Sequence, residues 1–470
     1  MSDFSEKLSQ EIKNTNKPLR YLAEASGLQL DYISKMSRGK RLPQDEEKLK
    51  RLLDAMECVL RTREILLQLY RQEKMGKAQW GCMQELIRII EQDVPEEKAE
   101  GKRFPGLSGE EQRVVSQGEV FRFLERMLAG NENGLIRIWT ASAGPEAMER
   151  LMQMIGRTSC GTLEHLFPLW QNRQEEDSLE NLRRLRVIKP AVLYDGYHPF
   201  FYYLKNPGEN SIGLFPNWFL SGDRALGVND TMDCGIILTE RSQVEAMQEE
   251  FRKKRRMAKA LISRSGIAEY MDKVNLMMNT GYVTRNYYIE QSPCLLHLIP
   301  LSVLKEHILI GGEQREELMR SIQLRTMHMQ KEDMVHIFSM EGLRYLMEEG
   351  RITGYPDALY RPLEGPMRTW LLKRYYQYIQ NTPHSCICVR EDCIRLPRHM
   401  SIVSSSNVDN GIAFWNSTRN GLRYYQMMEA GISQKLYDFC RFLEEGNMAF
   451  SCEETLELIG NLIVEYGGVL

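Results

Sequence analysis

The hydrophobic pattern of residues 4–75 predicts a run of short helices separated by polar breaks. Helix-forming residues dominate this stretch, and its apolar residues recur at spacings of three and four. The clearest of these positions are Leu49, Leu52, Leu53 and Met56. A second helical run is expected over residues 79–91. The stretch from Val94 to Glu111 then combines charge, Pro and Gly without periodicity, so we place an interdomain linker and the main domain boundary there.

Beyond the linker, short apolar runs alternate with amphipathic segments, which is typical of an α/β fold. Strands are predicted at residues 135–139, 191–194, 200–204, 212–215 and 234–238. Helices are predicted from Pro145 to Ile155 and from Ser242 to Met257. Pro suits the first turn of a helix, where no amide partner is needed.

A comparable order returns in the last third of the chain. Strands are predicted at residues 336–338, 386–389, 400–404 and 411–415, with helices after the capping residue Ser339, at 370–380 and at 433–445. The segments 235–239 and 411–415 hold similar places in the two runs. The similarity is one of order and not of residues, so it indicates either a duplicated α/β unit or two unrelated runs.

The stretch from Leu22 to Pro43 has the features of two helices that cross at a tight turn. Ala23 supplies the small residue that a crossing needs, and Gly27 lies four residues later, where the chain must turn. An apolar seam packs the second helix onto the first, and it consists of Leu22, Leu28 and Ile33. Gly39 ends the second helix in the usual C-terminal way.

This stretch resembles the helix-turn-helix of the Cro and lambda-repressor (Xre) class of transcriptional regulators. The matching residues are Leu22-Ala23, Gly27, Tyr32-Ile33-Ser34-Lys35 and Arg38-Gly39-Lys40-Arg41. The resemblance covers residues 4–60 and leaves most of the chain unexplained. It implies transcriptional control through double-stranded DNA, and regulators of this class usually bind as homodimers.

If the resemblance holds, residues 30–37 form the recognition helix, whose N-terminal part faces the major groove. The residues expected nearest the base edges are Gln29, Leu30, Asp31, Tyr32 and Lys35. Those expected to meet phosphates are Arg38, Lys40 and Arg41, and such contacts fix register without reading sequence.

The local charge agrees with a DNA-binding role. Between Lys13 and Arg41 we count seven Lys or Arg against Glu24 and Asp31, a balance of +5 in a chain whose net charge is −3. The family commonly has Gln where this chain has Leu19 and Leu30, and Leu cannot make the bidentate bonds that discriminate bases. A scaffold protein whose helix-turn-helix contacts protein, or a plain helical hairpin, therefore stays open.

The C-terminal region carries no catalytic motif that we can identify, so we expect no enzyme and no cofactor. The order of its elements resembles duplicated phospholipase D-like folds, which need a His followed two residues later by Lys; none of the eight His has this. No nucleophile elbow or phosphate-binding glycine motif is present either. The run His384, Cys386 and Cys388 suits either two buried thiols on a strand or a metal or redox site. We favour the thiols and predict no metal site.

Aromatic residues cluster between Tyr194 and Trp218. The cluster suits either a β core or a ligand pocket, for which we single out Tyr202 and Trp218 as ligand-binding candidates. The region is far longer than dimerisation needs, so we predict that it senses a small-molecule or peptide effector or mediates dimerisation.

Composition places the chain among ordinary globular proteins. Of 470 residues, 43% are hydrophobic and 27% charged, and the ten Cys are scattered as expected for reduced thiols. The first seven residues are polar and do not predict a signal peptide. The apolar stretch around residues 294–304 is about half the ~20 residues of a spanning helix. We therefore expect a cytoplasmic protein without a membrane segment.

The expected architecture is multidomain. An all-α helix-turn-helix domain over residues 1–75 is followed by a helix and linker over 76–111. Two α/β domains with mixed sheets then occupy 112–270 and 271–470, and the second either repeats the first or is independent of it.

Overall fold

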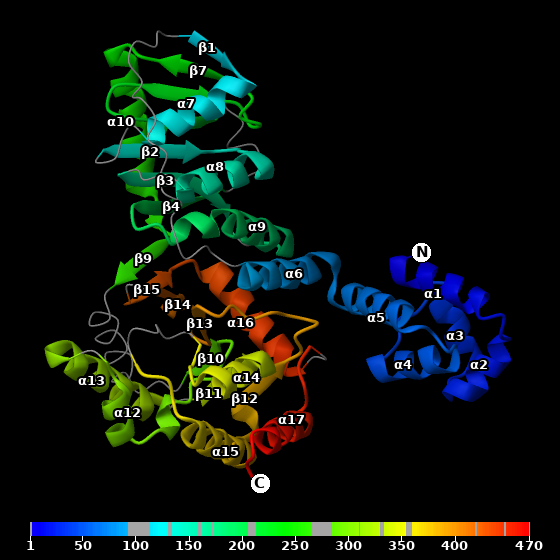
Figure 1. Cartoon of the computed structure of the whole chain (residues 1–470). Coiled ribbons are helices and arrows are strands. Elements are labelled where there is room, and N and C mark those ends of the chain that lie inside the picture. Colours follow the sequence, from blue (N-terminus) through cyan, green and yellow to red (C-terminus); the bar gives the residue numbers. More distant parts are fainter. Residues whose placement is uncertain are drawn as a thin grey trace. The chain divides into compact units, whose positions relative to one another are not determined.

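The computed structural model describes residues 2–92, 113–129, 134–157, 161–171, 173–204, 213–265, 284–309, 311–329, 333–353, 360–418, 421–445 and 448–469. These residues form two compact units, Met1–Gln84 and Glu85–Leu470 (Figure 1). We call them the small unit and the large unit. The multidomain α/β class expected from the sequence is confirmed, and the predicted linker from Val94 to Glu111 lies outside the described residues.

The small unit is entirely helical where it is described. Its helices are α1 (Asp3–Asn14), α2 (Leu19–Ser26), α3 (Leu30–Ser37), α4 (Glu46–Ala55), α5 (Leu60–Met75) and the first half of α6 (Lys77–Glu91). Each of the first five contributes an apolar stripe to one core, in which Leu8, Leu22, Ile33, Leu49 and Leu66 are fully buried. The periodicity seen in the sequence is therefore the core-facing stripe of each helix.

The first sheet of the large unit has eight strands in the order β1-β7-β6-β5-β2-β3-β4-β8 (Figure 1). The strands are β1 (Arg113–Ser116), β2 (Leu135–Thr140), β3 (Thr162–Trp170), β4 (Tyr197–Leu204), β5 (Asn217–Leu220), β6 (Ala225–Val228), β7 (Cys234–Leu238) and β8 (Lys259–Ala260). The helices that accompany them are α7 (Gln117–Ala129), α8 (Pro145–Arg157), α9 (Glu175–Val192) and α10 (Arg241–Met257).

The second sheet has seven strands in the order β12-β11-β10-β13-β14-β15-β9. The strands are β9 (Ile262–Ser265), β10 (Arg285–Ile289), β11 (Asp333–Ser339), β12 (Cys386–Val389), β13 (Met400–Ser405), β14 (Ile412–Thr418) and β15 (Gly421–Met427). The α-helices are α12 (Leu301–His307), α13 (Gly312–Met329), α14 (Met340–Glu349), α15 (Gly365–Asn381), α16 (Ala430–Glu445) and α17 (Cys452–Glu465). The short 3-10 helices are η1 (Leu296–Leu298), η3 (Pro383–Ser385) and η4 (Val408–Asn410).

The two sheets share one topology. In the first, β2, β3 and β4 are parallel neighbours, and β5, β6 and β7 add antiparallel strands on the other side of β2. In the second, β10, β11 and β12 are parallel, and β13, β14 and β15 add antiparallel strands on the other side of β10. An antiparallel edge strand, β1 or β9, completes each set. The repeated order of elements seen in the sequence therefore corresponds to a repeated order of strand pairing in the two sheets.

The match between individual segments differs from our expectation. Residues 235–239 fall on β7 and residues 411–415 on β14, yet by topology β7 corresponds to β15 and β14 to β6. The two segments therefore hold different places in the two sheets, and their similar places along the chain do not identify equivalent strands.

Two predicted strands are wrong. Residues 191–194 continue α9 to Val192, because the last turns of this helix bury Val187, Ile188 and Ala191 and so tolerate Pro190 inside it. In the segment 212–215, the described residues 213–215 form no strand, and β5 begins only at Asn217. Leu214 is 84% exposed, so its apolar character marks no core.

Candidate nucleic-acid interface

The turn between α2 and α3 has the geometry that the helix-turn-helix interpretation requires. Gly27 adopts φ +67°, a left-handed conformation that most side chains avoid. The Leu28 amide donates to the Ala23 carbonyl at 3.1 Å, which satisfies the end of α2, and the Leu28 side chain is buried beside Leu22 and Ile33. The small unit thus fixes the angle between the two helices through a glycine turn and an apolar seam.

One face of α3 is exposed. Gln29 and Leu30 stand at its start, with Leu30 41% exposed, and Asp31 and Lys35 follow on the same surface. The Lys35 Nζ lies 2.6 Å from an Asp31 carboxylate oxygen, one helical turn away. The ion pair with Lys35 offsets the negative charge of Asp31. It therefore reduces the repulsion between the Asp31 carboxylate and a DNA phosphate.

Tyr32 occupies a different place from its neighbours. Its side chain is half-buried against the core, and its hydroxyl accepts a hydrogen bond from the Gln44 amide at 2.7 Å. The guanidinium of Arg41 lies over its ring at 4.8 Å. Tyr32 therefore anchors the loop after α3 and holds Arg41, and only part of its ring faces outward.

The end of α3 presents three cations. Gly39 has φ +69°, and the amides of Gly39 and Lys40 donate to the carbonyls of Met36 and Lys35 at 3.0 and 2.9 Å. This closure ends the helix and leaves Arg38, Lys40 and Arg41 exposed in succession. Among the residues that the structure describes, no carboxylate forms an ion pair with any of the three.

The amide ends of the helices divide into two kinds. Helix α1 is closed by a capping box between Ser2 and Ser5, and α4 by Asp45, which accepts from the Lys48 amide at 2.8 Å. Helices α2 and α3 begin at Pro18 and Gln29 without a side-chain cap. Uncapped amides carry partial positive charge that attracts anions, so both helices of the motif can receive a phosphate.

The two predicted ligand-binding residues lie in a packed layer of the large unit. Tyr202 and Trp218 are half-buried against α10, where Phe251 and Val244 are fully or almost fully buried. The Trp139 indole donates to the Tyr202 hydroxyl at 3.3 Å, and the Trp218 ring covers Gly227 so closely that a Cβ there would lie 2.7 Å from it. Neither residue lines the two cavities described below.

Both cysteines of β12 lie on a strand, as predicted, with Cys388 buried and Cys386 half-buried. Burial raises the pKa of Cys386 to about 11 and that of Cys388 to about 12. The Tyr375 hydroxyl lies 3.3 Å from the Cys386 sulfur. A raised pKa keeps a thiol protonated at neutral pH and so makes it a poor nucleophile. Within the described ranges, no three His, Cys, Asp or Glu side chains are arranged to hold a metal ion.

Comparison with known proteins adds little. No known family model matches the chain, and no curated protein matches it. Solved structures with a faint likeness include the following two. TrmBL2, an archaeal DNA-binding chromatin protein, is 12% identical with a TM-score of 0.21 over 52% of this chain and 87% of that one. Polyphosphate kinase from Porphyromonas gingivalis is 10% identical with a TM-score of 0.20 over 76% of this chain and 56% of that one.

These scores are too low for either structure to support an argument about function, so the assignment depends on the residues themselves. Within the described residues, every helix is too short or too polar to cross a bilayer. The best-defined candidate site is the surface formed by α3 and the loop after it. We call this surface, consisting of Gln29, Leu30, Asp31, Lys35, Arg38, Lys40 and Arg41, the α3 surface.

Proposed function

We propose that the chain is a DNA-binding transcriptional regulator whose α3 surface contacts double-stranded DNA. The observation that carries the proposal is the run of exposed, unpaired cations Arg38, Lys40 and Arg41 at the end of a helix held by a glycine turn. Cations in that position neutralise phosphates, and the helix before them has the size and exposure to enter the major groove.

The roles within the α3 surface follow from chemistry. Arg38, Lys40 and Arg41 contact phosphates, with Arg41 positioned by the Tyr32 ring. Gln29 stands at the start of α3, where its amide can reach a base edge, and Leu30 can contact a thymine methyl. The Lys35 ammonium group interacts with both the Asp31 carboxylate and the DNA. Base discrimination is therefore modest, and affinity depends mainly on phosphates.

A fluorescence-anisotropy titration of the full chain with random duplex DNA at two salt concentrations tests the proposal. We expect the affinity to fall with salt through counterion release, with a slope of about −0.9 per phosphate contact. The double variant Arg38→Ala/Arg41→Ala should reduce the slope by about two and weaken all sequences equally. Lys77→Ala, at a position 83% exposed on α6, is the matched control. Wild-type binding by a folded double variant would contradict the assignment.

We also propose that the chain binds DNA as a homodimer. The start of α5 exposes apolar side chains in the small unit: Val59 is 69% exposed and Leu60 is 78% exposed. Exposed neighbouring apolar residues favour a protein contact, and a dimer reads two half-sites where one helix-turn-helix reads one. Sedimentation should show a dimer at tens of micromolar and a monomer for Leu60→Glu. A wild-type chain that stays monomeric with and without DNA would exclude the dimer.

If the wild-type chain does not bind random duplex DNA, while Leu60→Glu loses a protein other than a second copy of the chain, the small unit contacts protein and not DNA. That result would support the scaffold alternative. Within the regulator proposal, the large unit has the role of sensing an effector.

A further inference from the structure

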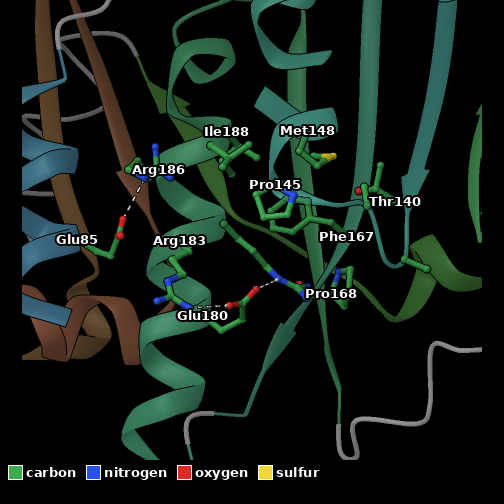
Figure 2. Close-up of a pocket in the computed structure, with 14 residues that line it drawn as sticks. Glu85, Thr140, Pro145, Met148, Phe167, Pro168, Glu180, Arg183, Arg186 and Ile188 are labelled. Carbon is green, nitrogen blue, oxygen red and sulfur yellow. Dashed lines mark hydrogen bonds and ion pairs between the residues drawn. The ribbon is translucent and has the colours of Figure 1, made fainter. Parts of the chain in front are cut away.

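The large unit contains a cavity of about 310 Å³ at one edge of its first sheet (Figure 2). Thr140 at the end of β2, Phe167 and Pro168 near the end of β3, Pro145 at the start of α8, and α9 form its walls. Strands β2 and β3 are parallel, so the cavity lies beyond their carboxyl ends. Open α/β sheets bind ligands in this crevice, and about 300 Å³ is the lower end of the usual size for small molecules.

One wall is rich in guanidinium groups. Arg186 is satisfied by two carboxylates, that of Glu85 at 3.0 Å and that of Glu149 at 3.1 Å. Arg183 and Arg184 share the single carboxylate of Glu180, at 3.7 and 3.6 Å. Because two guanidinium groups share one carboxylate, the pair holds one positive charge in excess.

Arg183 and Arg184 differ in exposure. Arg184 also donates to the Pro168 carbonyl and is largely buried, and burial lowers its pKa. Its guanidinium is therefore held in place at the cavity wall. The Arg183 side chain is 54% exposed, so it can turn toward an incoming anion. A fixed and a mobile guanidinium together suit a carboxylate or phosphate, which accepts several N–H groups at once.

The opposite wall is apolar. Met148 of α8, Phe167 of β3 and Ile188 of α9 face the cavity from the side away from Glu180 and Arg183 (Figure 2). Thr140 also lines the cavity, and its Oγ1 lies 2.7 Å from His165 Nε2. The other ring nitrogen of His165 lies 2.6 Å from the Tyr197 hydroxyl, and burial lowers the pKa of His165 to about 3. His165 is therefore uncharged at neutral pH, and Thr140 is the uncharged polar group that this network presents to the cavity.

We propose that this cavity binds a small organic anion, whose carboxylate or phosphate is held by Arg183 and Arg184 and whose apolar body packs on Met148 and Phe167. The proposal rests on the proposed function in one respect: it makes this anion the effector of the DNA-binding regulator. The site itself is independent of DNA.

Calorimetric titration of the full chain, in a buffer without phosphate, tests the site with four probes. Phenyl phosphate and benzoate each join an anionic group to a ring, benzyl alcohol lacks the charge, and inorganic phosphate lacks the ring. We expect one or both aromatic anions to bind and to exceed the other two probes by about tenfold in affinity. A preference between phenyl phosphate and benzoate identifies the anionic group. Failure of both to bind at about 10 mM, or equal binding of inorganic phosphate, overturns the proposal.

Two variants locate the binding. Arg183→Gln removes an exposed charge and should weaken phenyl phosphate about tenfold, and Met148→Trp should fill the apolar side and abolish binding. Arg252→Gln, which removes an exposed arginine on α10, should bind like wild type. If the first two variants fold and bind like wild type, the probe is elsewhere and the proposal is wrong.

The DNA variant separates this inference from the proposed function. Arg38→Ala/Arg41→Ala should keep the wild-type affinity for phenyl phosphate, and Arg183→Gln should keep the wild-type affinity for DNA without ligand. If DNA binding fails in the wild-type chain while phenyl phosphate still binds, the cavity assignment stands without the regulator. If the reverse holds, the regulator stands and the cavity assignment falls.

Discussion

The two sheets of the large unit have one topology, but they differ at one equivalent position, the region beyond the carboxyl ends of the parallel strands. We call this region the corner of each half. Beyond the carboxyl ends of β2 and β3 the first half has an open cavity of about 310 Å³. In the second half, the residues that follow β10, Glu290 to Ser292, are all nearly inaccessible. The Ser292 amide donates to Thr353 Oγ1 at 2.7 Å, and the Ser292 hydroxyl donates to the Gly342 carbonyl at 2.7 Å. The corner of the second half is therefore filled.

The described cavity of the second half is of another kind. It measures about 40 Å³ and is lined mainly by aliphatic side chains such as Leu304, Ile308 and Leu363. Both halves nevertheless have a buried His at the same register. His165 lies opposite the fourth residue of β2, and His336 opposite the fourth residue of β10. The strand pairing is thus common to both halves, while the side chains around it decide which half can admit a ligand.

The largest difference should appear at glycines near the two corners. A Cβ on Gly342 would lie 2.0 Å from the Gln291 carbonyl oxygen, whereas a Cβ on Gly144 would lie 3.5 Å from the Asp230 carbonyl oxygen. We expect Gly342→Ala to lower the free energy of unfolding by about 3 kcal/mol or more, because backbone must move, and Gly144→Ala to change it by less than about 0.5 kcal/mol. Denaturant unfolding of the full chain measures both. Equal effects would show that the second corner is not closely packed.

A smaller difference is expected from truncating the cavity linings. Leu304 is 6% exposed in the second half, and Met148 is half-buried in the first. Leu304→Ala should cost about 2–3 kcal/mol, since it leaves a void among aliphatic side chains. Met148→Ala should cost less than about 1 kcal/mol, because its site already borders open space. Calorimetric unfolding of both variants measures these free energies. A larger loss of stability for Met148→Ala than for Leu304→Ala would contradict the comparison.

The buried His165 of the first half should make stability depend on pH. Burial lowers its pKa to about 3, well below the ~6.5 of an unfolded His, so the unfolded chain binds a proton that the folded chain does not. This part of the stability is full above pH 6.5 and falls by about 1.4 kcal/mol per pH unit as the pH drops toward 3. His165→Gln should remove that slope, measured by unfolding between pH 7 and 5. His384→Gln, at an exposed position, is the matched control. An unchanged slope in His165→Gln would contradict the assignment.

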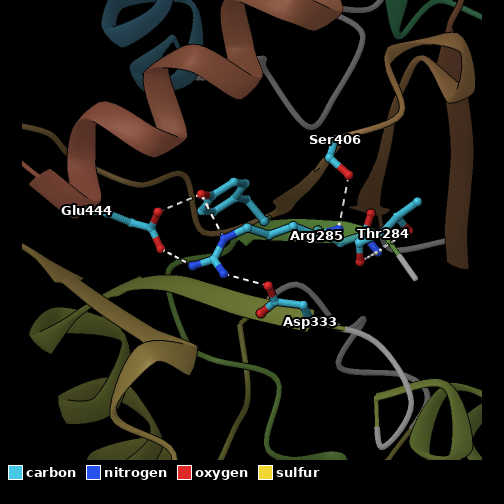
Figure 3. A network of polar contacts seen from close by, with 7 residues as sticks. Thr284, Arg285, Asp333, Ser406 and Glu444 are labelled. Atoms are coloured by element: carbon cyan, nitrogen blue, oxygen red, sulfur yellow. Dashed lines mark hydrogen bonds and ion pairs between the residues drawn. The ribbon is translucent and has the colours of Figure 1, made fainter. Parts of the chain in front are cut away.

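The smallest expected difference concerns the arginines that link each sheet to a helix. Arg285 bonds Tyr287 and Asp333 at 3.1 and 2.5 Å and also Glu444 of α16 (Figure 3). Arg137 donates to Glu164 and Gln248 at 3.2 and 2.7 Å, one carboxylate fewer than Arg285. We expect Arg285→Met to lower the free energy of unfolding by about 1–2 kcal/mol and Arg137→Met to lower it by about 0.5–1 kcal/mol. Both effects are small because the two arginine side chains are partly exposed and solvent screens their charges. The loss for Arg285→Met should shrink in 1 M salt. No salt dependence would exclude an ionic network.

The helix-turn-helix could be predicted because its signals are local. Gly27, Ala23 and the seam through Ile33 lie within about a dozen residues, and each meets a requirement of backbone or packing within that span. The sequence also predicts which residues after Gly39 are exposed cations. It does not show that Tyr32 turns inward, because that depends on the Gln44 amide twelve residues away.

The cavity could not be predicted in the same way. Arg183, Arg184 and Arg186 alternate with the buried Leu182 and Leu185, a pattern that any charged surface helix shows. Only the packing of α9 beside β2, β3 and α8 turns those arginines into a cavity wall. The packing of the aromatic run ending at Trp218 could not be predicted for the same reason: composition does not show that α10 packs against Tyr202 and Trp218.

The sequence by itself determined the helical small unit, its glycine turn, the α/β class of the large unit and most of its strand and helix positions. These features depend on periodicity and backbone conformation, which act over a few residues. The tertiary structure alone decided which equivalent corner stays open, because that depends on volumes brought together from distant segments. Gly342 against Gln291 fills one corner, while Thr140 and Arg184 leave space at the other. Close packing makes such differences of a few atoms decisive, and no local pattern records them.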